Sequence, residues 1–230
     1  MGTRVGRAGL LVAAACLPAG CRLIDAADGD DPEGAACPAV QLLSDQFDDG
    51  VTGPDWAAYS DEGAALEEAD GALRVVYSGA TAAWAGYATA LPHDMRGGSL
   101  AAEVRQVGGM TILELNAGGV KVQTYADVVT LHATVMVDGE TVTSFETDYL
   151  AGAHVHWRMR EEVGRIHWET SADGSIWREL DARPTPLPLD AVTLLVSGGG
   201  VAGEPAAEFE SVDIEVADPD CASPARTVVQ

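Results

Sequence analysis

Four aspartates lie between Asp45 and Asp55, in the stretch DQFDDGVTGPD. The glycines and the proline of this stretch disfavour a regular helix or strand. The carboxylates of Asp45, Asp48, Asp49 and Asp55 offer the hard oxygen ligands that Ca²⁺ prefers. Turns without any metal also favour aspartate and glycine, so an ordinary turn is the alternative. The stretch therefore raises the hypothesis of a structural calcium ion at these four residues.

Two histidines and a glutamate form a second group of side chains that could bind a metal ion or a ligand. His156, His167 and Glu169 share one face if HVHWRMR and RIHWET are neighbouring strands. Two imidazoles and a carboxylate are a ligand set for zinc. With Arg158 they also make an ordinary solvated strand face, and that interpretation is favoured. The three residues remain weak candidates for contact with a ligand.

The elements that must position these groups are strands. The segments GALRVVYSG, SLAAEVRQV, MTILELNA, VKVQTYAD and VTLHATVMVDGETVTSFETDY alternate with a period of two, and Asp138-Gly139 predicts a hairpin turn in the last. AVTLLVSGGG is continuously apolar, which suits a strand buried on both faces. In AEFESVDIEV, Phe209 has the opposite parity to Val212, so we expect a bulge near Glu210 and Ser211. Roughly a dozen short strands without a helix predict a two-sheet sandwich or a barrel.

Three tryptophans lie in consecutive predicted strands between His154 and Leu180. A four-residue loop, EEVG, would pair Arg160 with Arg165 and therefore Trp157 with Trp168. Trp177 would then follow on the same face. The other residues on the same face of these strands are apolar. This favours tryptophans packed in the core over an exposed platform for sugar rings. SADGSIW in the same region is similar to the Asp box, a structural hairpin motif of sialidases and related propellers, but it is one residue short and unrepeated.

Residues 1–20 have the features of a secretion signal. Arg4 and Arg7 precede the apolar stretch AGLLVAAACLPAG, which is too short to span a bilayer. LPAGC, ending at Cys21, resembles a bacterial lipobox, whose cysteine becomes the lipidated first residue, although Pro18 stands where an aliphatic residue is usual. We expect an exported protein, anchored through Cys21 in the cell envelope at the outer membrane or cell surface; ordinary cleavage nearby is the alternative.

The remaining cysteines frame the predicted domain. Cys16 leaves with the signal, and Cys37 and Cys221 form an even pair in an exported chain, which predicts a disulfide. Such a bond requires the first and last strands to lie side by side, and it would stabilise the fold by ~4–5 kcal/mol before strain. We expect an acidic tether at residues 21–36, the domain at 37–221 and a loose tail at 222–230.

The charge of the chain excludes one class of partner. Its 36 Asp and Glu against 13 Lys and Arg give a net charge of −23, which repels nucleic acids and anionic lipid headgroups. We therefore expect no nucleic acid and no membrane contact except through the lipid. A neutral glycan, a cation or an envelope protein remains compatible with this surface.

Four stretches share their pattern with one known superfamily: DQFDDG (45–50), WAGYATALPHDMRGGSLAAEVRQV (84–107), HWRMREEVGRIHWETSADGSIW (156–177) and AEFESVDIEV (207–216). Together they resemble the concanavalin A-like lectin/glucanase superfamily, in a bacterial branch akin to laminin G modules. The resemblance implies an all-β, two-sheet antiparallel jelly-roll sandwich with a concave face. It also implies binding of glycans or protein surfaces, but it names no ligand.

Catalysis is not expected. Superfamily members that cut glycans carry Glu-x-Asp-x-x-Glu on one strand, the two glutamates acting as nucleophile and acid. The nearest stretch here, EFESVDIE, has the order Glu208, Glu210, Asp213, Glu215 and lies in the last strand. The chain also has no Gly-x-Ser-x-Gly motif and no lone reactive cysteine. We therefore predict a protein without catalytic residues.

The favoured hypothesis is a non-catalytic, lipid-anchored cell-envelope module that binds a glycan or another surface molecule. The first alternative is a structural or assembly subunit of an envelope complex with no small ligand. The second is an atypical glycoside hydrolase.

Overall fold

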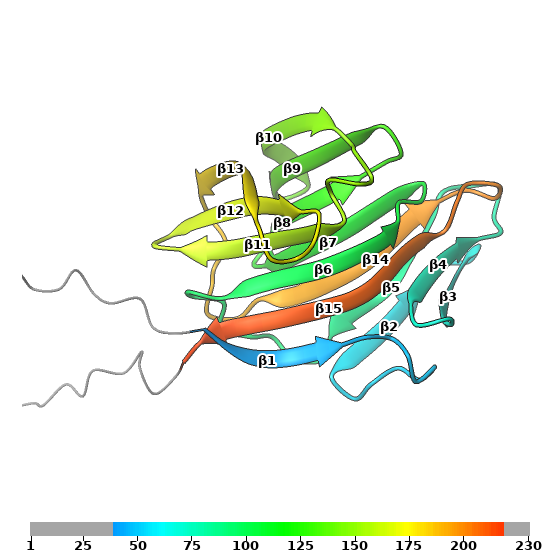
Figure 1. The fold of residues 1–230 in the computed structure, drawn as a ribbon, viewed down its shortest axis with the longest axis horizontal. Helices are drawn as coiled ribbons and strands as arrows, with labels where there is room; N and C mark the ends of the chain where they lie inside the picture. Colours follow the sequence, from blue (N-terminus) through cyan, green and yellow to red (C-terminus); the bar gives the residue numbers. More distant parts are fainter. Residues whose placement is uncertain (1–38, 219–230) are drawn as a thin grey trace, which may run out of the picture. The chain divides into compact units, whose positions relative to one another are not determined.

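Strands alone make up the regular structure of residues 39–218, the part of the chain that the computed structural model describes. Alternating side chains cover one face of each strand with apolar groups, so the strands gather into two antiparallel sheets, A and B, packed face to face (Figure 1). The prediction of an all-β, two-sheet jelly-roll sandwich is confirmed.

Sheet A combines four strands from the first half of the chain with four from the second half. Its spatial order is β13 (Arg178–Pro184), β12 (Arg165–Ser171), β11 (His156–Glu162), β6 (Ser99–Gln106), β15 (Ala207–Ala217), β4 (Leu73–Tyr77) and β3 (Ala64–Glu68). The first strand, β1 (Ala39–Asp45), also pairs antiparallel with β15, with Ala39 opposite Ala217. The first and last described strands therefore lie side by side, as a bond between Cys37 and Cys221 requires.

Sheet B contains the middle of the chain. Its spatial order is β10 (Glu140–Asp148), β9 (Thr130–Val137), β8 (Val120–Ala126), β7 (Met110–Ala117), β14 (Thr193–Gly200), β5 (Ala83–Thr89) and β2 (Trp56–Ser60). Strand β14 lies between β7 and β5, and its residues from Val196 to Gly200 are buried on both faces. The continuous apolar run predicted this position correctly.

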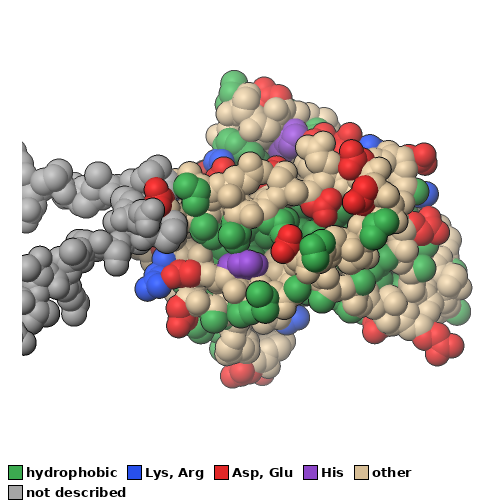
Figure 2. All heavy atoms as spheres, turned by 90° about the horizontal axis from the view of Figure 1, so that it is seen from below, with side chains coloured by type: hydrophobic (Ala, Val, Ile, Leu, Met, Phe, Trp, Pro, Cys, Tyr) green, Lys and Arg blue, Asp and Glu red, His purple; other side chains and the backbone are tan. Residues whose placement is uncertain are grey.

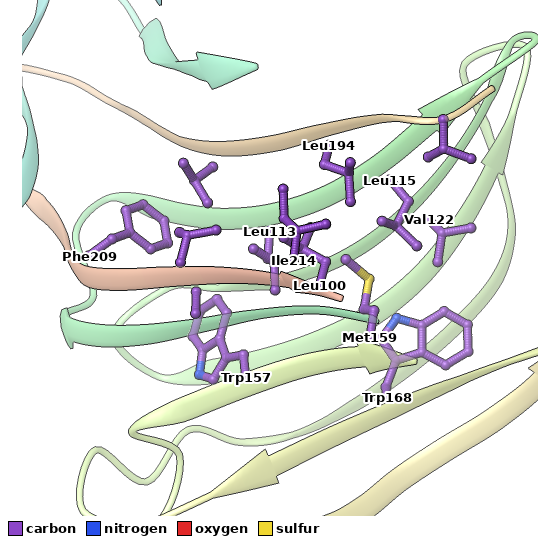
Figure 3. Close-up of a cluster of buried hydrophobic side chains, with 14 of the residues drawn as sticks. Leu100, Leu113, Leu115, Val122, Trp157, Met159, Trp168, Leu194, Phe209 and Ile214 are labelled. Carbon is purple, nitrogen blue, oxygen red and sulfur yellow. The ribbon is translucent and has the colours of Figure 1, made fainter. Parts of the chain in front are cut away.

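The hydrophobic core fills the space between the sheets (Figure 3). Sheet A contributes Trp157, Trp168 and Met159, none of which exposes more than 1% of its surface. The indole Nε1 of Trp168 donates a hydrogen bond of 3.0 Å to the carbonyl oxygen of Gln123 in sheet B. This bond joins the two sheets through the core and fixes the position of β8.

The predicted register of the β11–β12 hairpin is wrong. Glu162 pairs with Arg165, so the connection is a two-residue turn, Val163-Gly164, and not a four-residue loop. Both turn residues have positive φ, of 50° and 74°, which is the geometry that suits the twist of two antiparallel strands. Trp168 therefore lies opposite Met159 and not opposite Trp157. The shift is by two residues, so the inward and outward faces remain as predicted.

Trp177 does not join the core, contrary to the predicted ladder of three tryptophans. It lies in the loop before β13, half-buried, with the Arg158 guanidinium 4.0 Å from its ring centre. Because Arg158 has the outward parity of β11, Trp177 covers the outer face of sheet A. The loop carries it there because Ser171 and Asp173 hold the backbone of residues 173–176 in a tight turn.

Two other sequence predictions about the strands are confirmed. The register of β15 shifts between Phe209 and Ser211, which is the expected bulge, and both Phe209 and Val212 consequently reach the core. Asp138 and Gly139, with φ of 51° and 86°, form the turn between β9 and β10. Among residues 39–218 no helix has the length and apolar character needed to cross a membrane.

The surface is acidic. Figure 2 shows Asp and Glu side chains spread over the visible face, with few Lys or Arg between them. The spread is consistent with a solvated surface that repels polyanions.

Candidate functional site

A hollow of about 520 Å³ lies on the outer face of sheet B. Every strand of the sheet contributes to it, so it crosses the sheet from one edge to the other. Its lining residues are Tyr59, Trp84, Met110, Ile112, Glu114, Lys121, Gln123, Tyr125, Thr134, Met136, Thr141, Leu195 and Ser197. We call this feature the sheet-B groove.

Strand periodicity explains why these side chains share one face. On β7, Leu113 and Leu115 point into the core, so Ile112 and Glu114 must point away from it, into the groove. Glu114 nevertheless exposes only 5% of its surface. A carboxylate so shielded from water needs partners that compensate its charge.

Glu114 has three such partners. Asn116 Nδ2 donates to Oε1 at 2.9 Å, and Gln123 Nε2 donates to Oε2 at 2.5 Å. The ammonium of Lys121 lies 3.4 Å from Oε1. Gln123 is held in turn by Thr134, whose hydroxyl donates to Oε1 of the amide at 3.4 Å. The groove floor is therefore a fixed array of amide, hydroxyl and charged groups.

Trp84 covers the β5–β14 side of the groove. It pairs with Gly199, where a β-carbon would lie only 2.3 Å from two atoms of the indole ring. Glycine is therefore required at position 199, because any side chain would push the ring off the sheet. The indole packs directly over the backbone, which leaves an aromatic surface in the groove.

Tyrosines complete the aromatic lining. Tyr59 on β2 remains 37% exposed, and burial of its hydroxyl raises its pKa, while a hydrogen bond with Ser197 partly offsets the shift. Tyr125 on β8 stacks on His132 with ring centres 4.4 Å apart and planes 12° apart. The groove thus combines aromatic rings near both sides with a polar floor, the usual composition of a small-molecule site.

The predicted calcium ligands are not brought together as a metal site. The two carboxylate oxygens of Asp45 accept hydrogen bonds from the backbone N–H of Phe47 and from the indole of Trp56, and Asp49 accepts one from Val51. Among the described residues no three His, Cys, Asp or Glu side chains are grouped to hold a metal ion. The aspartates fix a turn, and calcium at Asp45, Asp48, Asp49 and Asp55 stays a prediction.

The weak ligand candidates lie on the outer face of sheet A. The Glu169 carboxylate accepts hydrogen bonds from Arg158 Nε at 2.7 Å and from Arg160 Nη2 at 3.5 Å. His167 Nδ1 contacts Glu179 at 2.6 Å, and His156 lies edge-on to Trp177. Glu169 is thus engaged in ion pairs and His167 in a hydrogen bond with Glu179, whereas His156 belongs to the surroundings of Trp177.

The acidic residues of β15 also face outward from sheet A. Glu208 pairs with Arg74 at 2.9 Å, and Glu210 pairs with Arg105 at 3.2 Å. Asp213 and Glu215 alternate with the buried Val212 and Ile214. None of the four lines the sheet-B groove. Cys21, Cys37 and Cys221 lie outside the described residues.

Comparison with solved structures places this geometry in a known architecture. A prokaryotic β-1,3-1,4-glucanase (lichenase) from a mouse hindgut metagenome is 11% identical, with a TM-score of 0.52 over 75% of this chain and 97% of that chain. A laminarinase from Flavobacterium sp. UMI-01 is 7% identical, with a TM-score of 0.57 over 76% and 99%. The exoplasmic/lumenal domain of VIP36, in its Ca²⁺/Man-bound form, is 12% identical, with a TM-score of 0.52 over 71% and 83%. The fold is the concanavalin A-like jelly roll.

This jelly roll confirms the resemblance deduced from the sequence. Because the identities are so low, the similarity shows the fold alone, and the same fold carries both hydrolases and a lectin. No protein-family model and no curated protein sequence matches the chain.

Sequence reasoning missed the residues of the groove. MTILELNA and VKVQTYAD were recognised as strands, but Glu114 and Gln123 within them were not singled out. A charged residue flanked by leucines in a central strand is a usable signal, because such a group persists only where partners compensate it. The partnership with Lys121 depends on strand register, which the sequence did not provide.

Proposed function

We propose that this protein is a non-catalytic, lipid-anchored module of the bacterial cell envelope that binds an extended neutral glycan in the sheet-B groove. The observation that carries the proposal is the groove itself, where Trp84 lies flat over Gly199 beside the polar array around Glu114. Sugar rings present apolar C–H faces and polar hydroxyl rims, which match these two kinds of surface.

The extent of the groove supports a chain-like ligand. Seven strands contribute, and neighbouring strands lie about 4.8 Å apart, so the axes of the outer strands are roughly 29 Å apart. A single sugar ring would occupy only part of this length. Structures with the same fold include a mannose-bound lectin domain and two enzymes whose names indicate glucan substrates.

The charges of the groove favour a neutral ligand. Lys121 is its one basic side chain among the described lining residues, and Glu114 already compensates it. The net charge of −23 adds a repulsive field for polyanions. Uronic-acid polymers and nucleic acids are thereby disfavoured.

The acidic content of the groove supports binding rather than hydrolysis. Glycosidases ordinarily place two carboxyl groups about 5–10 Å apart around the bond that they cut. Glu114 is the single acidic residue among the described lining residues, and both of its oxygens have partners. The similarity to two glucanases favours hydrolysis as the second candidate function.

Binding is tested with the full chain against immobilised β-1,3-1,4-glucan, laminarin and mannose oligosaccharides. Trp84→Ala should weaken binding at least tenfold, because it removes the aromatic surface over Gly199. Leu91→Ala is the control, since Leu91 is 71% exposed and does not line the groove. Equal binding by wild type and Trp84→Ala would contradict the proposed site.

Hydrolysis is tested by incubating the same glycans with wild type and Glu114→Gln and measuring reducing ends. We expect no release from either protein. Release by wild type that is lost in Glu114→Gln would replace the binding proposal with the enzyme. If no glycan binds and an envelope protein is recovered by pull-down, the assembly-subunit alternative gains support.

A further inference from the structure

A second hollow, of about 280 Å³, lies on the outer face of sheet A, opposite the groove. Its lining residues are Gln41, Ser99, Ala101, Arg158, Gly174, Trp177, Asp213 and Glu215. They come from β1, β6, β11, β15 and the loop between β12 and β13. We call it the sheet-A hollow.

Strand register creates this hollow. Ala101 on β6 lies between Arg158 on β11 and Asp213 on β15, and Ser99 lies beside Glu215. Two strand spacings, about 10 Å, separate β11 from β15. No ion pair joins Arg158 to Asp213 or Glu215 within residues 39–218. Opposite charges thus face each other across a floor of small side chains, with room for a molecule between them.

Arg158 is held firmly on its side of the hollow. Its Nε donates to Glu169 at 2.7 Å, and its guanidinium carbon lies 4.0 Å from the ring centre of Trp177. Within the described residues its two terminal nitrogens have no hydrogen-bond acceptor. The side chain is therefore preorganised, with donors left over.

Trp177 is positioned by the loop that carries it. Asp173 accepts hydrogen bonds from the backbone N–H groups of Ser175 and Ile176, at 2.9 and 3.0 Å. Gly174 packs against the ring of His156, where a β-carbon would be 3.3 Å from the nearest ring atom. The sequence similarity to the Asp box is thus explained by a rigid turn that presents an aromatic ring.

The opposite side supplies acceptors. Asp213 Oδ1 accepts from Gln41 at 3.2 Å, and Glu215 Oε2 accepts from Ser99 at 3.1 Å. The second oxygen of each carboxylate has no donor among the described residues. A ligand here meets donors on one side, acceptors on the other and an aromatic ring.

We propose that the sheet-A hollow is a second ligand site that binds one neutral pyranose unit, independently of the sheet-B groove. Hydroxyls on opposite sides of a sugar ring both donate and accept, so one ring satisfies Arg158 and Asp213 together. A simple anion would face both carboxylates, and a simple cation would face the guanidinium. The volume lies just below the usual range for ligand pockets, so it suits one ring and not a polymer.

The test uses saturation-transfer NMR of the full chain with methyl glycosides of neutral hexoses, pentoses and N-acetylhexosamines. At least one glycoside should bind the wild type. Ala101→Leu, which fills the floor from an outward position, should weaken that binding at least tenfold. Ala101→Ser keeps the room and should bind within twofold of wild type. Trp177→Ala, on a surface loop, provides a second disrupting variant should Ala101→Leu fail to fold.

Trp84→Ala separates this site from the groove. Glycoside binding that survives Trp84→Ala but not Ala101→Leu or Trp177→Ala supports the second site, even if the groove binds no polysaccharide. Three results would overturn the proposal: no methyl glycoside binds, binding is lost in Trp84→Ala and kept in Ala101→Leu, or the hollow binds putrescine or acetate in place of sugars.

Discussion

Trp168 offers the sharpest test of how the two sheets are joined. Its indole is 99% buried and donates across the core to the carbonyl of Gln123, in the strand that also holds Glu114 through the Gln123 side chain. Trp168→Phe removes the donor and leaves the carbonyl without that partner, which costs about 1–2 kcal/mol. The missing ring atoms leave a cavity worth about 1–2 kcal/mol more. We expect a loss of about 2–4 kcal/mol in the free energy of unfolding.

The matched control is Trp177→Phe. Trp177 lies at the surface over Arg158, and phenylalanine keeps part of the cation–π contact, so the change should be below about 1 kcal/mol. Urea unfolding followed by far-UV circular dichroism gives both values, provided that the denaturant slopes agree. Equal losses for the two variants would refute the assignment of Trp168 to the core and Trp177 to the surface. A loss below 1 kcal/mol for Trp168→Phe would refute the inter-sheet role of the bond.

Three further predictions concern alkaline stability, the disulfide and the anchor. Burial and a hydrogen bond to Glu68 raise the pKa of Tyr87 from 10.0 to about 12, so the unfolded chain loses this proton first. The contribution of Tyr87 to the free energy of unfolding should therefore be constant below pH 10 and fall toward pH 12. Tyr87→Phe should flatten this alkaline decline in urea titrations. Intact-mass measurement after thiol alkylation without reductant should show Cys37 and Cys221 unmodified, and alkylation of both would contradict the bond. Cys21→Ala should move the protein from the membrane fraction to the soluble fraction, and retention in membranes would contradict lipidation.

The strand predictions depended on period-two alternation, and most of them are confirmed. Core positions such as Val212 and Ile214 follow from parity alone, because one face of each sheet has to be apolar. The β11–β12 register failed because the residues Glu161–Gly164 fit either a two-residue or a four-residue connection. A two-residue shift in register leaves every side chain on the same face of the sheet. The apolar pattern therefore does not distinguish the two registers.

Trp177 was misplaced for a different reason. Parity counting assumes an unbroken strand, whereas residues 172–177 form a loop that hydrogen bonds of Asp173 and Ser171 close. The loop frees Trp177 from strand alternation and turns it onto the outer face. Sequence similarity to the Asp box signalled a structured turn, but not the face to which the turn delivers the ring.

The sequence by itself determined the strand content, the inward faces, the acidic surface and the resemblance to the concanavalin A-like jelly roll. These properties depend on local alternation and composition, which are written along the chain. Only the tertiary structure decided which outward side chains meet. The contact of Glu114 with Lys121 depends on the register of the β7–β8 hairpin. The contact of Trp84 with Gly199 and the Ala101 gap between Arg158 and Asp213 depend on pairing between strands that are distant in sequence. Both candidate sites depend on that pairing. Their residues point away from the core, so the apolar pattern of the sequence does not indicate which of them become neighbours.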